Sequence, residues 1–207
     1  MKLTHFLASC LLMIGCQSEI DDKTAAEVAP AAAPAKAAPA KAAAEAPAGS
    51  LKLQPSSKIE WVGAKLSDDH TGGFKSLSGH AMVADGTLTS AKVVIDLSSL
   101  HSDHPKLTKH LLSDDFFDVS QFTTATFEVT EVTAADAGIS KVTGTLDLHG
   151  MQKSITFPAT VQATADSASI AAEFTLLRKD FGMTYPGKPD DLIRDEVLVK
   201  GTLRFGS

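Results

Sequence analysis

The stretch VTGTLDLHGMQKSITFPATV, residues 142–161, decides the fold class of this chain. On both sides of a central His149-Gly150 pair, apolar or small residues alternate with polar ones. The residues that share one face are Val142, Gly144, Leu146, Leu148, Ile155, Phe157, Ala159 and Val161. A period of two is typical of a half-buried β-strand, and glycine readily adopts the positive φ of a tight turn. The stretch therefore predicts two strands joined by a hairpin.

The same alternation continues through most of the chain after Leu51. It recurs in KIEWVGAKL, GGFKSLSGHAMVA, SAKVVIDLSSL, TATFEVTEV, SASIAAEFTLL and DEVLVKGTLRF, which brings the expected total to about eight strands. The sequence ADGT at 84–87 predicts a second hairpin turn, and residues 105–112 predict one short helix with Pro105 in its first turn. Because most strands follow each other at hairpin distance, we expect an all-β fold. The prediction is a closed, eight-stranded antiparallel barrel with one short helix, and a β-sandwich is the alternative.

The composition distinguishes between two kinds of barrel. A transmembrane barrel turns apolar residues outward and carries girdles of aromatic residues at both interfaces. This chain has one Trp and one Tyr, and the polar positions of its strands carry Lys, Asp and Glu. These features predict an apolar interior and a polar exterior in contact with water.

The residues expected inside the barrel differ in size, from phenylalanine to alanine and glycine. A barrel of eight strands is just wide enough either to be filled by side chains or to hold one small ligand. Small inward residues favour a cavity, and a taper packed by alternating large and small side chains is the alternative. The predicted lining residues are Trp61, Phe74, Ile95, Phe116, Phe117, Phe127, Leu146, Phe157, Ile170 and Phe174. Of these, we expect Phe116 and Phe117 to lie at one end of the barrel.

A glycine pair, Gly72-Gly73, lies in the second of the expected strands. It lacks the strand-to-helix context and the following Lys of a phosphate-binding loop. We expect these glycines to let the strand bend or the chain enter the barrel, and the flanking His70 and His80 to be polar surface residues.

The first residues of the chain have the features of a targeting signal. Lys2 precedes a mostly apolar run at 3–14, which is too short for a stable membrane-spanning helix and ends in Gly15-Cys16. This ending resembles a bacterial lipobox and predicts a signal peptide at 1–15 with acylation of Cys16; an ordinary secretory signal is the alternative. An acylated Cys16 would anchor the chain on the periplasmic side of the cell envelope. Gln17, the next residue, favours the outer membrane.

A low-complexity segment separates this signal from the strands. Residues 24–50 are almost entirely Ala, Pro, Lys, Glu and Gly, as in AAPAKAAPAKAAAEAPAGS. Such a composition cannot bury a core, and the repeated prolines interrupt helix. We therefore expect residues 16–50 to form a lipidated N-terminus and a disordered linker, followed by a barrel domain at 51–207.

Several chemistries find no support in the sequence. A formal charge of −6 without a basic block argues against nucleic acid as a partner, and no cysteine follows Cys16 to form a thiolate metal site. The spacing of the histidines in HSDHPKLTKH, residues 101–110, is not that of a tight metal site. The acidic SDDFFD, residues 113–118, is interpreted as a polar turn, and no serine lies in a nucleophile elbow. We therefore expect no catalytic residue, metal or cofactor, and no enzymatic activity.

The whole strand region resembles the YceI-like family, over about residues 59–205. The resemblance rests on the order and spacing of HTGGFKSLSGH, AKVVIDLSSL, HLLSDDFFDVSQFTTATFE, VTGTLDLHGMQKSITFPATV and LRKDFGMTYPGKPDDLIRDEVLV. It implies a lipocalin-like barrel with a helix across one end, and long amphiphiles such as polyisoprenoids or fatty amides as ligands. Leu177 departs from the family pattern, because relatives often carry an acidic residue just before the arginine that corresponds to Arg178.

Together, the pattern and the resemblance predict a periplasmic lipoprotein, anchored through Cys16, that binds one long-chain amphiphile for storage or transport. A polyisoprenoid, a quinone-like lipid and a fatty amide are the candidate ligands, and Arg178 and Tyr185 are candidates to meet a polar head. The alternatives are a packed barrel that acts as a protein-interaction module, and a hydrolase or isomerase on the same barrel. The sequence does not indicate an oligomeric state.

Overall fold

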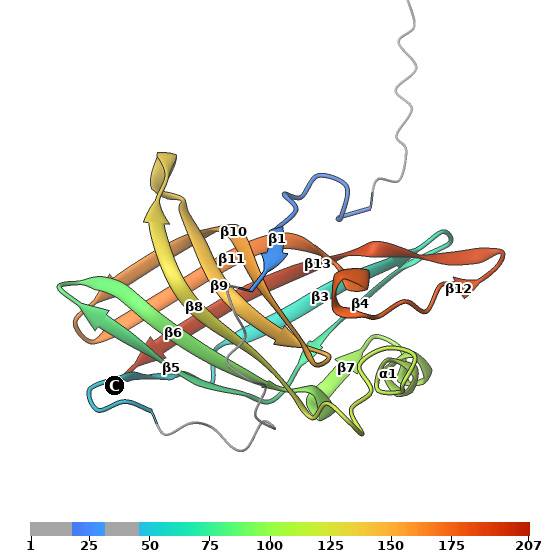
Figure 1. Cartoon of the computed structure of the whole chain (residues 1–207), viewed down its shortest axis with the longest axis horizontal. Coiled ribbons are helices and arrows are strands. Elements are labelled where there is room, and N and C mark those ends of the chain that lie inside the picture. The colour runs from blue at the N-terminus through green and yellow to red at the C-terminus, as the bar shows by residue number, and fades with distance from the viewer. Residues whose placement is uncertain (1–17, 32–45) are drawn as a thin grey trace, which may run out of the picture.

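The structure is a computed structural model that describes residues 18–31 and 46–207, in which thirteen strands form one sheet (Figure 1). The strands are β1 (Glu27–Pro30), β2 (Leu51–Leu53), β3 (Lys58–Lys65), β4 (Asp69–Phe74), β5 (Leu77–Ala84), β6 (Thr87–Asp96), β7 (Leu100–Ser102), β8 (Thr124–Ala134), β9 (Ser140–Leu148), β10 (Met151–Thr164), β11 (Ser167–Leu177), β12 (Gly187–Lys188) and β13 (Asp191–Gly206). The helices are α1 (Pro105–Leu111) and the short 3-10 segments η1 (Leu97–Ser99), η2 (Asp136–Gly138) and η3 (Arg178–Phe181).

Eight wall positions close the sheet into a barrel. The order β10-β9-β8-β6-β5-β2-β13-β11 returns to β10, and each of these ladders is antiparallel. Three wall positions consist of two strands in line, since β2 and β3 share the same edge of β13, and β4 and β7 extend β5 and β6. The predicted eight-stranded antiparallel barrel is therefore confirmed.

Both predicted hairpin turns are present. Asp85 and Gly86 connect β5 to β6, and His149 and Gly150 connect β9 to β10, with φ between 52° and 72° at all four residues. Two consecutive residues of positive φ are typical of the type I′ turn, whose twist matches that of the flanking strands. The turn chemistry thus sets the register of both pairs.

The helix α1 lies at one end of the barrel, as predicted, and ends one residue earlier than expected (Figure 1). Its buried residue Leu111 packs in a cluster with Trp61, Leu100 and Phe116. This cluster connects the helix to the strands β3 and β7 and to the acidic turn that follows the helix.

The segment 18–30, which we call the N-terminal strap, differs from the predicted disordered linker. Ile20 is 3% exposed and packs against Val62, Ala64 and Leu198 on the outer face of the wall. Its other end, β1, pairs antiparallel with β10. The predicted linker included these residues because the segment after them is rich in alanine and proline. The first proline is Pro30, however, and the strap before it carries apolar and charged side chains that contact the barrel.

β1 lies where β10 and β11 separate. These two strands pair only between 159–164 and 167–172, and β1 takes over the free edge of β10 at 153–156. On the other side, the Thr175 N–H of β11 donates to the Thr24 carbonyl at 3.0 Å, and the Ala26 N–H donates to the Thr175 carbonyl at 2.9 Å. The strap therefore fills a gap in the barrel wall. The predicted signal peptide, Cys16 and residues 32–45 of the linker lie outside the described residues.

Candidate ligand-binding cavity

A cavity of about 470 Å³ lies inside the barrel, at the end that carries α1. All ten residues predicted to line a cavity do line it. They are Trp61, Phe74, Ile95, Phe116, Phe117, Phe127, Leu146, Phe157, Ile170 and Phe174. Alternation placed the eight strand residues correctly, because every second residue of a wall strand faces inward, whereas Phe116 and Phe117 lie in the turn after α1. That these residues contact a ligand stays a prediction.

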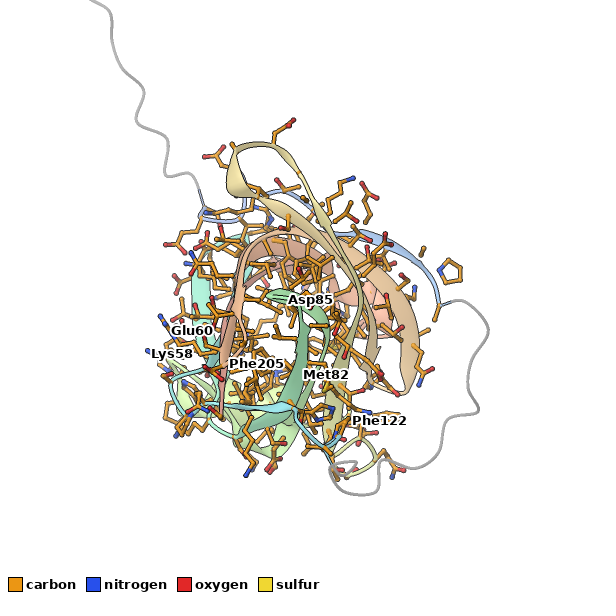
Figure 2. All side chains as sticks on the ribbon, turned by 90° about the vertical axis from the view of Figure 1, so that its left-hand side faces the viewer. Lys58, Glu60, Met82, Asp85, Phe122 and Phe205 are labelled. Atoms are coloured by element: carbon orange, nitrogen blue, oxygen red, sulfur yellow. The ribbon has the colours of Figure 1, made fainter. Side chains whose placement is uncertain are left out.

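The opposite half of the barrel is filled by side chains. Leu88 of β6, Val142 of β9, Ala168 of β11 and Phe205 of β13 are all buried, and none of them lines the cavity. Figure 2 views the molecule from this end, where Phe205 and the turn residue Asp85 lie. The predicted cavity is therefore present in one half of the barrel, and the alternative, a packed core, in the other half.

Three phenylalanines form the aromatic part of the lining. The rings of Phe157 and Phe174 are stacked with centroids 4.1 Å apart, and Phe127 lies 5.6 Å from Phe157. They come from β8, β10 and β11, so the contacts extend across the wall. Such rings give a rigid apolar surface with little conformational entropy to lose on binding.

Small inward residues have two different effects. A Cβ at Gly201 would meet no atom within 4 Å, so this position leaves open space in the cavity. A Cβ at Gly144, in contrast, would lie 2.5 Å from the ring of Phe127. Gly144 therefore makes room for a packed side chain and does not widen the cavity.

The glycine pair in β4 serves close packing. A Cβ at Gly72 would lie 2.3 Å from Cζ2 of Trp61 and 2.2 Å from the carbonyl oxygen of His101. Both glycines lie inside β4, which continues to Phe74, and the bend expected at them stays a prediction. Only a residue without a side chain lets β7 and the Trp61 indole approach β4 this closely.

Polar residues gather at the open end of the cavity. We call this set the rim and define it as Lys65, His70, His110, Tyr185, Lys188 and Asp191, all of which line the cavity. Lys65 Nζ donates to Asp191 Oδ2 at 2.7 Å, which connects β3 to the start of β13. This hydrogen bond raises the pKa of Lys65 and lowers the pKa of Asp191, so both stay charged at neutral pH.

Aromatic and imidazole rings form one side of the rim. The His110 ring on α1 contacts Phe116 and Tyr185 at centroid distances of 5.0 and 4.9 Å. Its Nε2 lies 2.8 Å from Asp115 Oδ2. The turn at 113–118 thus turns Phe116 inward and keeps its carboxylates outside, as the sequence predicts.

The other predicted histidines lie apart from this cluster. His70 Nδ1 is 3.2 Å from Asp103 Oδ2, and the His70 ring centroid lies 6.3 Å from that of His104, the N-cap residue of α1. Within residues 18–31 and 46–207, no three His, Cys, Asp or Glu side chains are grouped as ligands of one metal ion.

Arg178 is the charged residue buried in the cavity wall, with only 5% of its surface exposed. Its Nε donates to the Arg194 carbonyl at 3.1 Å and one Nη donates to the Met183 carbonyl at 2.8 Å. The other Nη donates to Asp195 Oδ1 at 3.0 Å. Burial lowers the pKa of this guanidinium and Asp195 opposes the shift, so the group stays charged.

Comparison with known proteins gives the family. The model of the YceI-like domain matches residues 51–205. The chain belongs to the YceI-like family. A UPF0312 protein of Pseudomonas putida strain W619 is 31% identical over 172 residues, which cover 76% of this chain and 88% of that protein. The YceI-like region starts where β2 begins, so the strap lies outside the family match.

Two solved structures share this YceI-like fold. BcnA of Burkholderia cenocepacia superimposes with a TM-score of 0.63 at 22% identity, over 73% of this chain and 98% of BcnA. A polyisoprenoid binding domain from Saccharophagus degradans gives a TM-score of 0.62 at 21% identity, over 75% and 97% of the two chains. No helix among the described residues is long and apolar enough to cross a membrane.

Proposed function

We propose that this protein is a periplasmic lipoprotein, anchored through acylated Cys16, which holds one long-chain amphiphile in its barrel for storage or transport. The observation that carries the proposal is the cavity of about 470 Å³, which lies within the usual range of about 300–1,000 Å³ for ligand sites. Its inner wall is apolar, so the transfer of a hydrocarbon chain from water into it is favourable.

The polar rim supports an amphiphile over a pure hydrocarbon. A chain in the cavity places its head near Arg178 and Tyr185, at the open end. A guanidinium has five N–H groups, and the hydrogen bonds described for Arg178 use three of them. The remaining donors suit an anionic or hydroxyl head group.

The relatives support an isoprenoid as the apolar chain. The Saccharophagus degradans domain is a polyisoprenoid binding domain that shares the fold of this chain. A branched isoprenoid chain also fits a lining that mixes aliphatic side chains with phenylalanine. A quinone-like lipid and a fatty amide are the other members of this ligand class.

The anchoring part of the proposal is supported by the sequence at 1–16. A mass measurement on the chain recovered from bacterial membranes tests it. We expect the mass of a chain that starts at Cys16 and carries acyl groups. An unmodified chain, or one cleaved elsewhere, would contradict the lipoprotein assignment and leave the cavity unaffected.

The binding part can be tested with a cavity-filling variant. Gly201→Leu places a side chain in the open space, whereas Thr202→Leu adds a similar side chain to the outer face of the same strand. Trp61, the single tryptophan of the chain, lines the cavity and reports its occupancy by fluorescence. We expect a polyprenol to change the fluorescence of the native chain and of Thr202→Leu but not that of Gly201→Leu. Equal responses in all three chains would contradict binding in the cavity. No response in any of them, repeated with a quinone and a fatty amide, would favour the interaction module.

A further inference from the structure

Two exposed leucines lie side by side at the open end of the barrel. Leu66 is 71% exposed and Leu192 is 46% exposed. The Leu66 N–H donates to the Leu192 carbonyl at 3.1 Å, so the two residues are direct neighbours. Ile139, which is 40% exposed, lies at the β8–β9 turn and is not part of this pair.

The leucine pair lies directly beside the entrance of the cavity. Leu66 follows Lys65 and Leu192 follows Asp191, the ion pair of the rim. In Figure 1, the tip of β3 and β4 and the tip of β12 and β13 project at the same end of the barrel as α1. A flat apolar partner that contacts these leucines therefore faces the cavity entrance.

The N-terminal strap starts at this same tip. Ser18 Oγ donates to Asp69 Oδ2 at 2.7 Å, at the first residue of β4. Ile20 then holds the strap against β3 and β13. Cys16 precedes Ser18 by two residues, which span at most about 7 Å. A membrane anchor on Cys16 therefore attaches close to the leucine pair.

We propose that Leu66, Leu192 and the rim form a membrane-contact face, which holds the entrance of the cavity against the lipid bilayer. This inference rests on the proposed acylation of Cys16. With the entrance at the bilayer surface, an apolar chain passes between membrane and cavity without full exposure to water, the step that otherwise opposes transfer.

The charges at the tip indicate how the face works. Asp68, Asp69 and Asp190 lie within three residues of a leucine of the pair in sequence, beside the Lys65–Asp191 pair and Lys188, so acidic residues outnumber basic ones at the tip. An acidic surface is not attracted to anionic lipids. Two leucines alone give weak attachment, so the acyl anchor supplies the affinity and the leucines set the orientation of the barrel.

Site-specific labelling tests this orientation. Cys10 lies in the leader that is removed and the acylated Cys16 has no free thiol, so a new cysteine is the labelling site. We would label full chains carrying Leu66→Cys, Leu192→Cys or the control Ile139→Cys with an environment-sensitive fluorophore. The acylated chains are then reconstituted into phosphatidylcholine vesicles with or without nitroxide-labelled lipids.

We expect nitroxide lipids to quench the labels at 66 and 192 several-fold and to leave the label at 139 unchanged. Equal quenching at all three positions, or quenching at 139 alone, would overturn the proposed orientation. Mass measurement of the same chains identifies a failure of acylation separately. If acylation fails, chains that begin at Gln17 are held on the vesicles by an N-terminal His tag and nickel-chelating lipids, and an unquenched label at 66 then overturns the membrane-contact face.

Discussion

At the scale of single residues, the packing of Trp61 on Gly72 controls both stability and the cavity wall. Gly72→Ala brings a methyl group to within 2.3 Å of the indole and 2.2 Å of the backbone oxygen of His101, which cannot move freely. We expect a loss of about 1–3 kcal/mol in the free energy of unfolding, as in other overpacked cores, and a shift in Trp61 fluorescence. Chemical denaturation measures both. Gly201→Ala is the control, because its Cβ meets open space. Similar losses for the two variants would contradict this packing argument.

Arg178 is the second residue whose role follows from its contacts. Arg178→Met removes the donors to the Met183 and Arg194 carbonyls and leaves them unpaired, which costs about 1–3 kcal/mol per buried group. Lys179→Met is a matched control, because Lys179 also pairs with Asp195 but its side chain is 53% exposed. Exposed pairs contribute about 0–1 kcal/mol, so denaturation should separate the two variants clearly. A loss in the control equal to that of Arg178→Met would show that the pair with Asp195, and not the carbonyls, accounts for the effect.

Sequence reasoning located the lining residues better than the polar ones. Alternation alone assigns Phe127 or Phe157 to the inside, because the period of two leaves no other choice on an amphipathic strand. It cannot assign Arg178, since burial of a charge depends on carbonyls and a carboxylate that come from distant residues. It also missed Leu107 and His110, which line the cavity only because α1 folds across the end.

At the scale of elements, the N-terminal strap carries three charged contacts in addition to Ile20 and the backbone pairing of β1. Asp21 pairs with Arg194 at 2.7 Å, Glu19 with Lys200 at 2.7 Å, and Lys23 with Glu173. The hydrogen bond from Arg194 lowers the pKa of Asp21, and the hydrogen bond from Lys23 lowers the pKa of Glu173. These carboxylates stabilise the docked strap fully at a pH above their ordinary pKa of about 4. Their contribution is lost as the pH falls through the lowered pKa values of the folded protein.

Amide hydrogen exchange can measure this docking. We expect the Ala26 N–H, which donates to the Thr175 carbonyl, to be protected at neutral pH and low salt. Its protection factor should fall at high salt, because exposed ion pairs are screened, and at acid pH for the reason above. The Val142 N–H in the wall strand β9 serves as the control and should stay protected under both conditions. Unchanged protection of Ala26 under both conditions would show that backbone pairing alone holds the strap.

The elements themselves could be predicted to different degrees. The eight wall positions were found because each carries its own alternation and most are joined by short turns. Three of these wall positions are divided into two strands, as between β4 and β5. The alternation of apolar and polar residues does not reveal such a division, and the prediction missed it. The strand β1 was missed because its four residues pair with β10, more than a hundred positions away, and a low-complexity neighbourhood hides them.

At the scale of the whole molecule, the barrel combines a packed half with a hollow half. The packed half, with Val142 and Phe205 at its centre, supplies a core that does not depend on a ligand. On this basis we expect the fold to persist with the cavity empty or occupied. We therefore expect extraction of any bound lipid to lower the midpoint of thermal unfolding without abolishing cooperative unfolding, as calorimetry would show. Loss of the cooperative transition on extraction would mean that the ligand is part of the core.

The central claim is that the cavity holds one amphiphile, and native mass spectrometry of the full chain tests it most directly. The chain would be purified gently from its host membranes and measured before and after organic extraction. The account predicts one reproducible additional mass per chain, removed by extraction and identified in the extract as a long-chain amphiphile. A bare chain before extraction, which also gains no mass with polyprenol, quinone or fatty amide, would contradict it.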